Sequence, residues 1–153
     1  MAESEFVYAT YIRTTPEKLW RALTEPEFLR QFWFGMTQES DWEPGASWCM
    51  KFADGRIADA GEVVESEPHR RLVLKWRHEM RPELKAEGYS RMTYELAQKG
   101  DAVKFTVHHE IETPNSKLIE AVSGGWPMIL SSLKSFLETG EALSAIGPSP
   151  KEK

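Results

Sequence analysis

The amino-acid sequence predicts an α+β fold in which a mostly antiparallel sheet curls around a long C-terminal helix. Three features of the chain lead to this prediction. Residues 124–140 carry apolar side chains at helical spacing, residues 37–111 consist mainly of alternating segments joined by short turns, and two short helical segments follow the first β-type segment. Runs of strands and helices that are segregated along the chain are typical of the α+β class.

Residues 5–13, EFVYATYIR, are rich in β-forming side chains and predict the first strand. Two short helices are expected directly after it. Thr14 stands three residues before Glu17, which is the spacing of a capping box, and Pro16 between them suits a first helical turn. The sequence Thr24-Glu25-Pro26-Glu27 repeats this signal and predicts the start of a second helix.

The alternating segments between 37 and 111 predict strands whose inner faces look at the last helix. Asp54-Gly55 is a favoured hairpin turn, and residues 78–88, HEMRPELKAEG, are polar and predict a mobile connection. The parity of the strands places four sets of side chains inward: Trp48, Met50 and Phe52; Leu72, Leu74, Trp76 and His78; Met92 and Tyr94; and Val103, Phe105, Val107 and His109.

The last helix is predicted from apolar residues three and four positions apart, namely Trp126, Ile129, Leu130, Leu133, Phe136 and Leu137. Gly140 is a suitable residue to end it. Pro127 would cost about 3 kcal/mol inside a continuous helix. We therefore expect a kink or a fresh start at 124–127, with 116–123 forming a separate short helix or turn.

The composition indicates one soluble domain, which we expect to cover residues 1–144 and to be followed by a polar tail, 145–153. The net charge of −5 argues against nucleic acid as the main partner, and no apolar run approaches the length of a membrane span. The single cysteine, Cys49, cannot form an internal disulfide, and the N-terminus lacks the features of a signal peptide. These observations predict a cytoplasmic protein.

This order of elements resembles the START/Bet v 1-like superfamily (SRPBCC), and within it the branch similar to the C-terminal domain of the Hsp90 ATPase activator Aha1. The motifs that carry the resemblance are TTPEKLWRALTEPEFLRQFW at 14–33, GEVVESEPHRRLVLKW at 61–76 and GWPMILSSLKSFLETG at 125–140. The resemblance implies a helix-grip fold, in which a curved seven-stranded antiparallel sheet surrounds the C-terminal helix and leaves a cavity between them. Similar proteins bind lipids, sterols, polyketides and other apolar molecules, and a few are cyclases or hydrolases.

The candidate cavity residues are ten inward-facing side chains, namely Trp48, Met50, Trp76, His78, Met92, Tyr94, Phe105, His109, Trp126 and Leu130. Four of them, His78, Tyr94, His109 and Trp126, would converge as polar tips in an apolar wall. Such a wall is the usual composition of a small-molecule site.

No metal, cofactor or catalytic site is expected. His108 and His109 are adjacent on a strand and point to opposite faces, so they make a poor metal pair. The chain contains none of the common nucleophile, zinc or phosphate-loop motifs. By parity Asp59 and Glu62 also face opposite ways, which leaves no visible acid/base pair.

Three functions are consistent with these features. The first is a carrier that binds a small apolar or amphipathic molecule under the last helix, with access controlled by residues 78–88 and by Phe34-Gly35. The second is an Aha1-like co-chaperone or stress-response interaction module. Separately from the choice of function, exposed sheet edges or the early helices are candidate surfaces for a homodimer. The family's Hsp90 activators carry an additional N-terminal domain, and none precedes Glu5, so direct contact with Hsp90 is not expected. The third is a cyclase-like or hydrolase-like enzyme.

Overall fold

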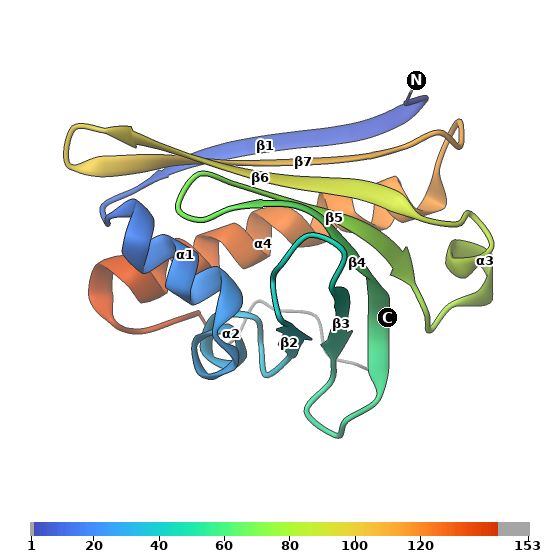
Figure 1. Cartoon of the computed structure of the whole chain (residues 1–153), viewed down its shortest axis with the longest axis horizontal. Coiled ribbons are helices and arrows are strands. Elements are labelled where there is room, and N and C mark those ends of the chain that lie inside the picture. The colour runs from blue at the N-terminus through green and yellow to red at the C-terminus, as the bar shows by residue number, and fades with distance from the viewer. Residues whose placement is uncertain (1, 144–153) are drawn as a thin grey trace.

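The computed structural model of the chain describes residues 2–143. These residues form one seven-stranded antiparallel sheet in the order β1-β7-β6-β5-β4-β3-β2, with helices packed on it (Figure 1). Strand β1 closes one edge by pairing with the last strand, and the remaining strands follow one another as a meander. In chain order the elements are β1 Ser4–Ile12, α1 Pro16–Thr24, α2 Pro26–Phe32, β2 Thr37–Ser40, β3 Ser47–Lys51, β4 Ile57–Glu67, β5 Arg71–His78, α3 Pro82–Lys85, β6 Ser90–Lys99, β7 Ala102–Ile111 and α4 Lys117–Thr139.

The predicted helix-grip architecture is confirmed. Helix α4 runs across one face of the sheet. Helices α1 and α2 lie together near the C-terminal end of α4 (Figure 1). The inner faces of the strands and of α4 together form the main hydrophobic core. The expected polar tail, 145–153, lies outside the described residues.

Helix α4 is continuous from Lys117 to Thr139, so the predicted fresh start at 124–127 and the separate short helix or turn at 116–123 are wrong. At 23 residues it is about 34 Å long, at about 1.5 Å per residue. Both halves are anchored by packing, because Leu118 is buried in a small cluster with α3 and β7, and Leu130 is buried in the main core. This burial outweighs the missing hydrogen bond at proline. Gly140 ends the helix in the left-handed conformation, as predicted.

The starts of the early helices are one residue later than the sequence suggested. Thr15, not Thr14, is the N-cap of α1, and its hydroxyl accepts a hydrogen bond from Lys18 N. Thr24 is the last residue of α1, and its hydroxyl donates to the Trp20 carbonyl oxygen. Helix α2 therefore begins after Glu25 without a side-chain cap. The one-residue difference at α1 arises because Thr14 and Thr15 are adjacent and either could cap the helix. At α2 it arises because the Glu25 N–H donates to the Arg21 carbonyl oxygen of α1.

The connection between β5 and β6, which its polarity predicted to be mobile, contains local structure. It contains the short helix α3, whose Leu84 is buried against Ile111 and Leu118. Further along, the Glu87 carboxylate accepts hydrogen bonds from Ser116 Oγ and, at 2.8 Å, from Lys117 N at the start of α4. A carboxylate is favourable at a helix N-terminus, so the connection is fastened to α4.

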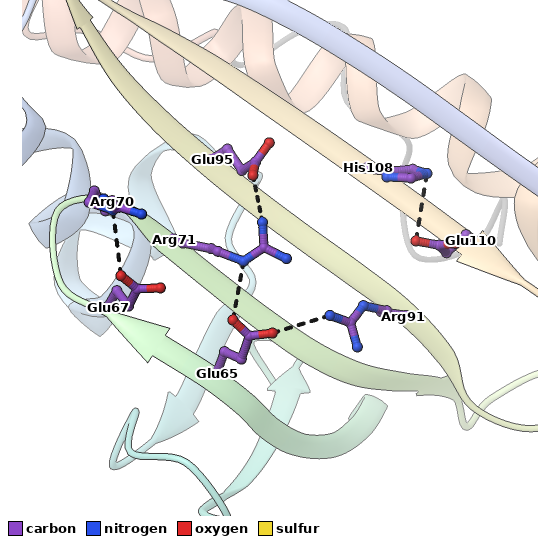
Figure 2. Close-up of polar contacts among 8 residues, drawn as sticks. All are labelled: Glu65, Glu67, Arg70, Arg71, Arg91, Glu95, His108 and Glu110. Atoms are coloured by element: carbon purple, nitrogen blue, oxygen red, sulfur yellow. Dashed lines mark hydrogen bonds and ion pairs between the residues drawn. The ribbon is translucent and has the colours of Figure 1, made fainter.

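The outer face of the sheet carries charged side chains that form ion pairs between neighbouring strands. Arg71 lies between Glu65 and Glu95, and Arg91 also contacts Glu65 (Figure 2). These side chains alternate along their strands with the buried residues of the inner face. Exposed ion pairs of this kind contribute little to stability, and we assign this face no role beyond solvation.

Candidate functional site

A cavity of about 360 Å³ lies between the sheet and the N-terminal half of α4. Its walls come from the end of β3, from β4 and β5, from α3, and from α4. The side chains and backbone that line it are Trp33, Met36, Met50, Phe52, Ala58, Asp59, Trp76, His78, Arg81, Leu84, Leu118, Ala121, Val122, Gly124, Gly125, Trp126, Met128 and Ile129. The wall is thus mostly apolar, with Asp59, His78 and Arg81 as its charged or titratable members.

Two adjacent glycines of α4 are among the residues that line the cavity. Gly124 and Gly125 lie in α4 on the cavity wall, and a Cβ atom added to either would meet no heavy atom within 4 Å beyond its chain neighbours and its own helix. Gly125 is half-buried, and a larger side chain there would change the cavity wall, whereas Gly124 is exposed. Glycine in a helix interior is less stable than alanine, so two glycines in succession lower the stability of α4.

An aromatic cluster forms the floor beneath the cavity. The rings of Trp48 and Trp76 have centroids 4.6 Å apart, and Trp76 and Trp126 meet at 5.7 Å. Gly61 of β4 is paired with Trp48 on one side and Trp76 on the other, so its missing side chain lets the two indoles approach. A Cβ at Gly61 would also lie only 1.8 Å from the Lys75 carbonyl oxygen.

Asp59 and His78 form a hydrogen-bonded pair on the cavity wall. They are opposite one another in the register of β4 and β5, and Asp59 Oδ2 lies 3.3 Å from His78 Nδ1. The same carboxylate oxygen accepts a hydrogen bond of 2.6 Å from Trp76 Nε1. The neighbouring strands thereby hold a carboxylate, an imidazole and an indole in one fixed group.

A second polar group is buried beneath the cavity and is fully satisfied. Trp126 Nε1 donates to His109 Nδ1 at 3.2 Å, so the imidazole hydrogen belongs on Nε2, which lies 2.7 Å from Ser90 Oγ. The Ser90 hydroxyl in turn donates to the Trp76 carbonyl oxygen. Complete burial, and to a smaller extent the neighbouring His108, lowers the pKa of His109 to about 3, which keeps the ring neutral.

The ten predicted cavity residues divide into two groups. Met50, Trp76, His78 and Trp126 line the cavity. Tyr94 and His109 gather around Trp126, whereas His78 pairs with Asp59 instead of joining them. The remaining six are buried in the core and do not contribute to the cavity wall; they are Trp48, Met92, Tyr94, Phe105, His109 and Leu130.

The comparison of Asp59 with Glu62 by parity did not find the titratable side chain that pairs with Asp59. Asp59 is buried and Glu62 is exposed, as parity required, but the partner of Asp59 is His78 on the adjacent strand. A comparison confined to one strand misses such a pair. Aligning the hairpin of β4 and β5 on Gly61 and Trp76 would have placed Asp59 opposite His78.

His108 and His109 point to opposite faces, as predicted: His109 is buried, and His108 lies on the outer face 2.7 Å from Glu5. Among residues 2–143, no three His, Cys, Asp or Glu side chains are grouped so that they could hold a metal ion. Within the same residues, none of the helices has the length and apolar character needed to span a membrane.

Comparison with known proteins places the chain in a family. Residues 13–138 match the model of the family described as activator of Hsp90 ATPase homolog 1-like protein. The chain belongs to this Aha1-like family. The resemblance noted in the sequence is thereby confirmed, although membership does not specify a ligand or a reaction. A search of curated proteins found no match.

Solved structures of other proteins share the fold. The protein MLL2253 from Mesorhizobium loti is 22% identical, with a TM-score of 0.76 over 88% of this chain and 97% of that one. CalU16 from Micromonospora echinospora is 19% identical, with a TM-score of 0.71 over 89% and 77%. The Aha1 dimer from Colwellia psychrerythraea is 18% identical, with a TM-score of 0.72 over 91% and 99%. At these identities the likeness establishes the fold.

Proposed function

We propose that this Aha1-like protein binds a small apolar or amphipathic molecule in the cavity between the sheet and α4. The observation that carries the proposal is the cavity itself, which has about 360 Å³ of volume and a mostly apolar wall around the Asp59–His78 pair. Small-molecule sites typically have about 300–1,000 Å³ and combine an apolar lining with a few polar groups. This cavity lies at the small end of that range and suits a compact ligand.

The two glycines of α4 support the same proposal. A helix whose only task was to complete the core would gain stability from alanine at both positions, because space for the methyl groups is available. Glycine at Gly125 leaves this part of the cavity wall without a side chain. The second candidate, an interaction module with a filled interior, accounts less well for this unfilled space.

The proposal is tested by binding of a neutral fluorescent apolar probe, N-phenyl-1-naphthylamine, together with analysis of a solvent extract of the freshly purified protein. Gly125→Leu adds a bulky side chain to the cavity wall and is expected to weaken probe binding at least tenfold. Ser131→Leu is the matched control, since Ser131 is exposed on the same helix and does not line the cavity. Equal binding by the wild type and both variants would show that the probe binds elsewhere and would contradict the proposal.

A further inference from the structure

The Asp59–His78 pair carries information about the kind of ligand that the cavity takes. Both side chains lie on the cavity wall, and only 9% and 14% of their respective surfaces are exposed. Their positions are fixed by the pairing of β4 with β5, and Asp59 is further held by the Trp76 indole. The pair is therefore built into the sheet.

The hydrogen-bond partners define which nitrogen of His78 carries a hydrogen. An ionised carboxylate only accepts, so His78 Nδ1, 3.3 Å from Asp59 Oδ2, is the donor. The Trp76 indole cannot reverse this arrangement, because it too is only a donor to that oxygen. In the neutral imidazole, a hydrogen on Nδ1 leaves a lone pair on Nε2.

His78 Nε2 is buried and has no hydrogen-bond partner among residues 2–143. An unpaired buried acceptor is unfavourable, and such atoms are rare in folded proteins. Because neighbouring atoms cover Nε2, a ligand reaches it by shifting side chains of the cavity wall. His109 offers no similar acceptor, since Ser90 and Trp126 occupy both of its nitrogens.

We propose that the cavity selects apolar molecules that carry an O–H donor, such as a phenol, an enol or an alcohol, and that His78 Nε2 accepts this hydrogen while Asp59 orients the ring. The inference rests on the proposed binding function and adds the chemistry of the ligand to it. The apolar wall contacts the apolar part of the ligand, and His78 Nε2 accepts a hydrogen bond from the single polar group of the ligand.

The test compares 2-naphthol with 2-methylnaphthalene, which have the same ring system and differ in an O–H against a methyl group. Affinities are measured by displacement of N-phenyl-1-naphthylamine at pH 8, above the range in which histidine ordinarily titrates. The wild type is expected to prefer 2-naphthol about tenfold, the effect of one good hydrogen bond. His78→Phe is expected to lose the preference for 2-naphthol and to keep its affinity for 2-methylnaphthalene. His108→Phe, on the outer face, is expected to keep the preference of the wild type.

A second measurement uses the wild-type protein alone, so it does not require that any variant folds. In the ¹⁵N spectrum of the wild type, His78 Nδ1 is expected to be protonated and Nε2 unprotonated, and only 2-naphthol should shift the Nε2 signal. Equal wild-type affinities for both compounds, or a protonated Nε2 with a bare Nδ1, would overturn the inference and leave the cavity function intact. Failure of both compounds to displace the bound probe would overturn the inference alone, whereas failure of the probe itself to bind would overturn the binding function and the inference with it.

Discussion

Replacing Gly124 and Gly125 by alanine should stabilise the protein. Both residues lie in the interior of α4, neither has a positive φ, and an added methyl group at either position meets nothing within 4 Å outside the local helix. Glycine in a helix interior is less stable than alanine by about 0.5–1 kcal/mol. The double substitution is therefore expected to raise the free energy of unfolding by about 1–2 kcal/mol.

For a chain of this length, each kcal/mol corresponds to a change in Tm of about 2–4 °C, so the double variant should melt about 2–8 °C higher. Urea unfolding followed by circular dichroism measures the free energy directly. Binding of N-phenyl-1-naphthylamine by the double variant tests whether the methyl group added to the cavity wall at Gly125 also weakens the probe.

Gly140→Ala provides the matched control, because it makes the same chemical change at the end of the same helix. Gly140 has a φ of 88°, a left-handed conformation that disfavours alanine by about 1–2 kcal/mol. Gly140→Ala should therefore lower Tm, whereas Gly124→Ala/Gly125→Ala should raise it. A loss of stability in Gly124→Ala/Gly125→Ala would refute the reasoning, since it would mean that the methyl groups meet a packed wall.

Three further predictions concern the core. Gly61→Ala should destabilise by about 3 kcal/mol or more in urea unfolding, because its methyl group would lie 1.8 Å from the Lys75 carbonyl oxygen. Pro127→Ala should stabilise by about 2 kcal/mol in the same assay, since it restores the N–H that Pro127 cannot donate to the Ser123 carbonyl. His109 has a lower pKa in the folded state, about 3 against an ordinary 6.5, so the unfolded chain takes up the proton first. The stability that His109 contributes above pH 6.5 should fall by about 2 kcal/mol between pH 6.5 and 5, measured as the difference between the wild type and His109→Gln.

Each of these predictions has a contrary outcome. A Gly61→Ala variant as stable as the wild type would mean that β4 and β5 separate easily at Lys75. Unchanged stability of Pro127→Ala would mean that the helix adapts fully to proline. A difference between the wild type and His109→Gln that is constant with pH would indicate that water or a proton reaches His109.

Local features of the sequence predicted most of the fold. The alternation of apolar residues along the strands determines which side chains face inward, because neighbouring residues on a strand point to opposite faces. Trp48, Met50, Trp76 and His109 are all buried or on the cavity wall for this reason. The spacing of apolar residues up to Leu137 and the glycine at 140 likewise predicted the extent of the C-terminal part of α4.

The site depended on pairings between strands, which sequence parity does not contain. Asp59 meets His78 because β4 and β5 pair in one particular register, which includes an irregularity between Val63 and Glu65. An irregularity of one residue exchanges the two faces of a strand beyond it. The Asp59–His78 pair therefore depends on the register of β4 against β5, which a comparison within one strand does not supply.

The sequence by itself determined the fold class, the inward faces and the family, because these follow from periodicity and motifs within short segments. Only the tertiary structure decided that α4 passes Pro127 unbroken, that Glu87 fastens the β5–β6 connection to α4, and that a cavity remains beside Gly125. Each of these depends on the balance between a local preference and the packing of distant segments. That balance is a property of the assembled core, in which burial outweighs a local cost of a few kcal/mol.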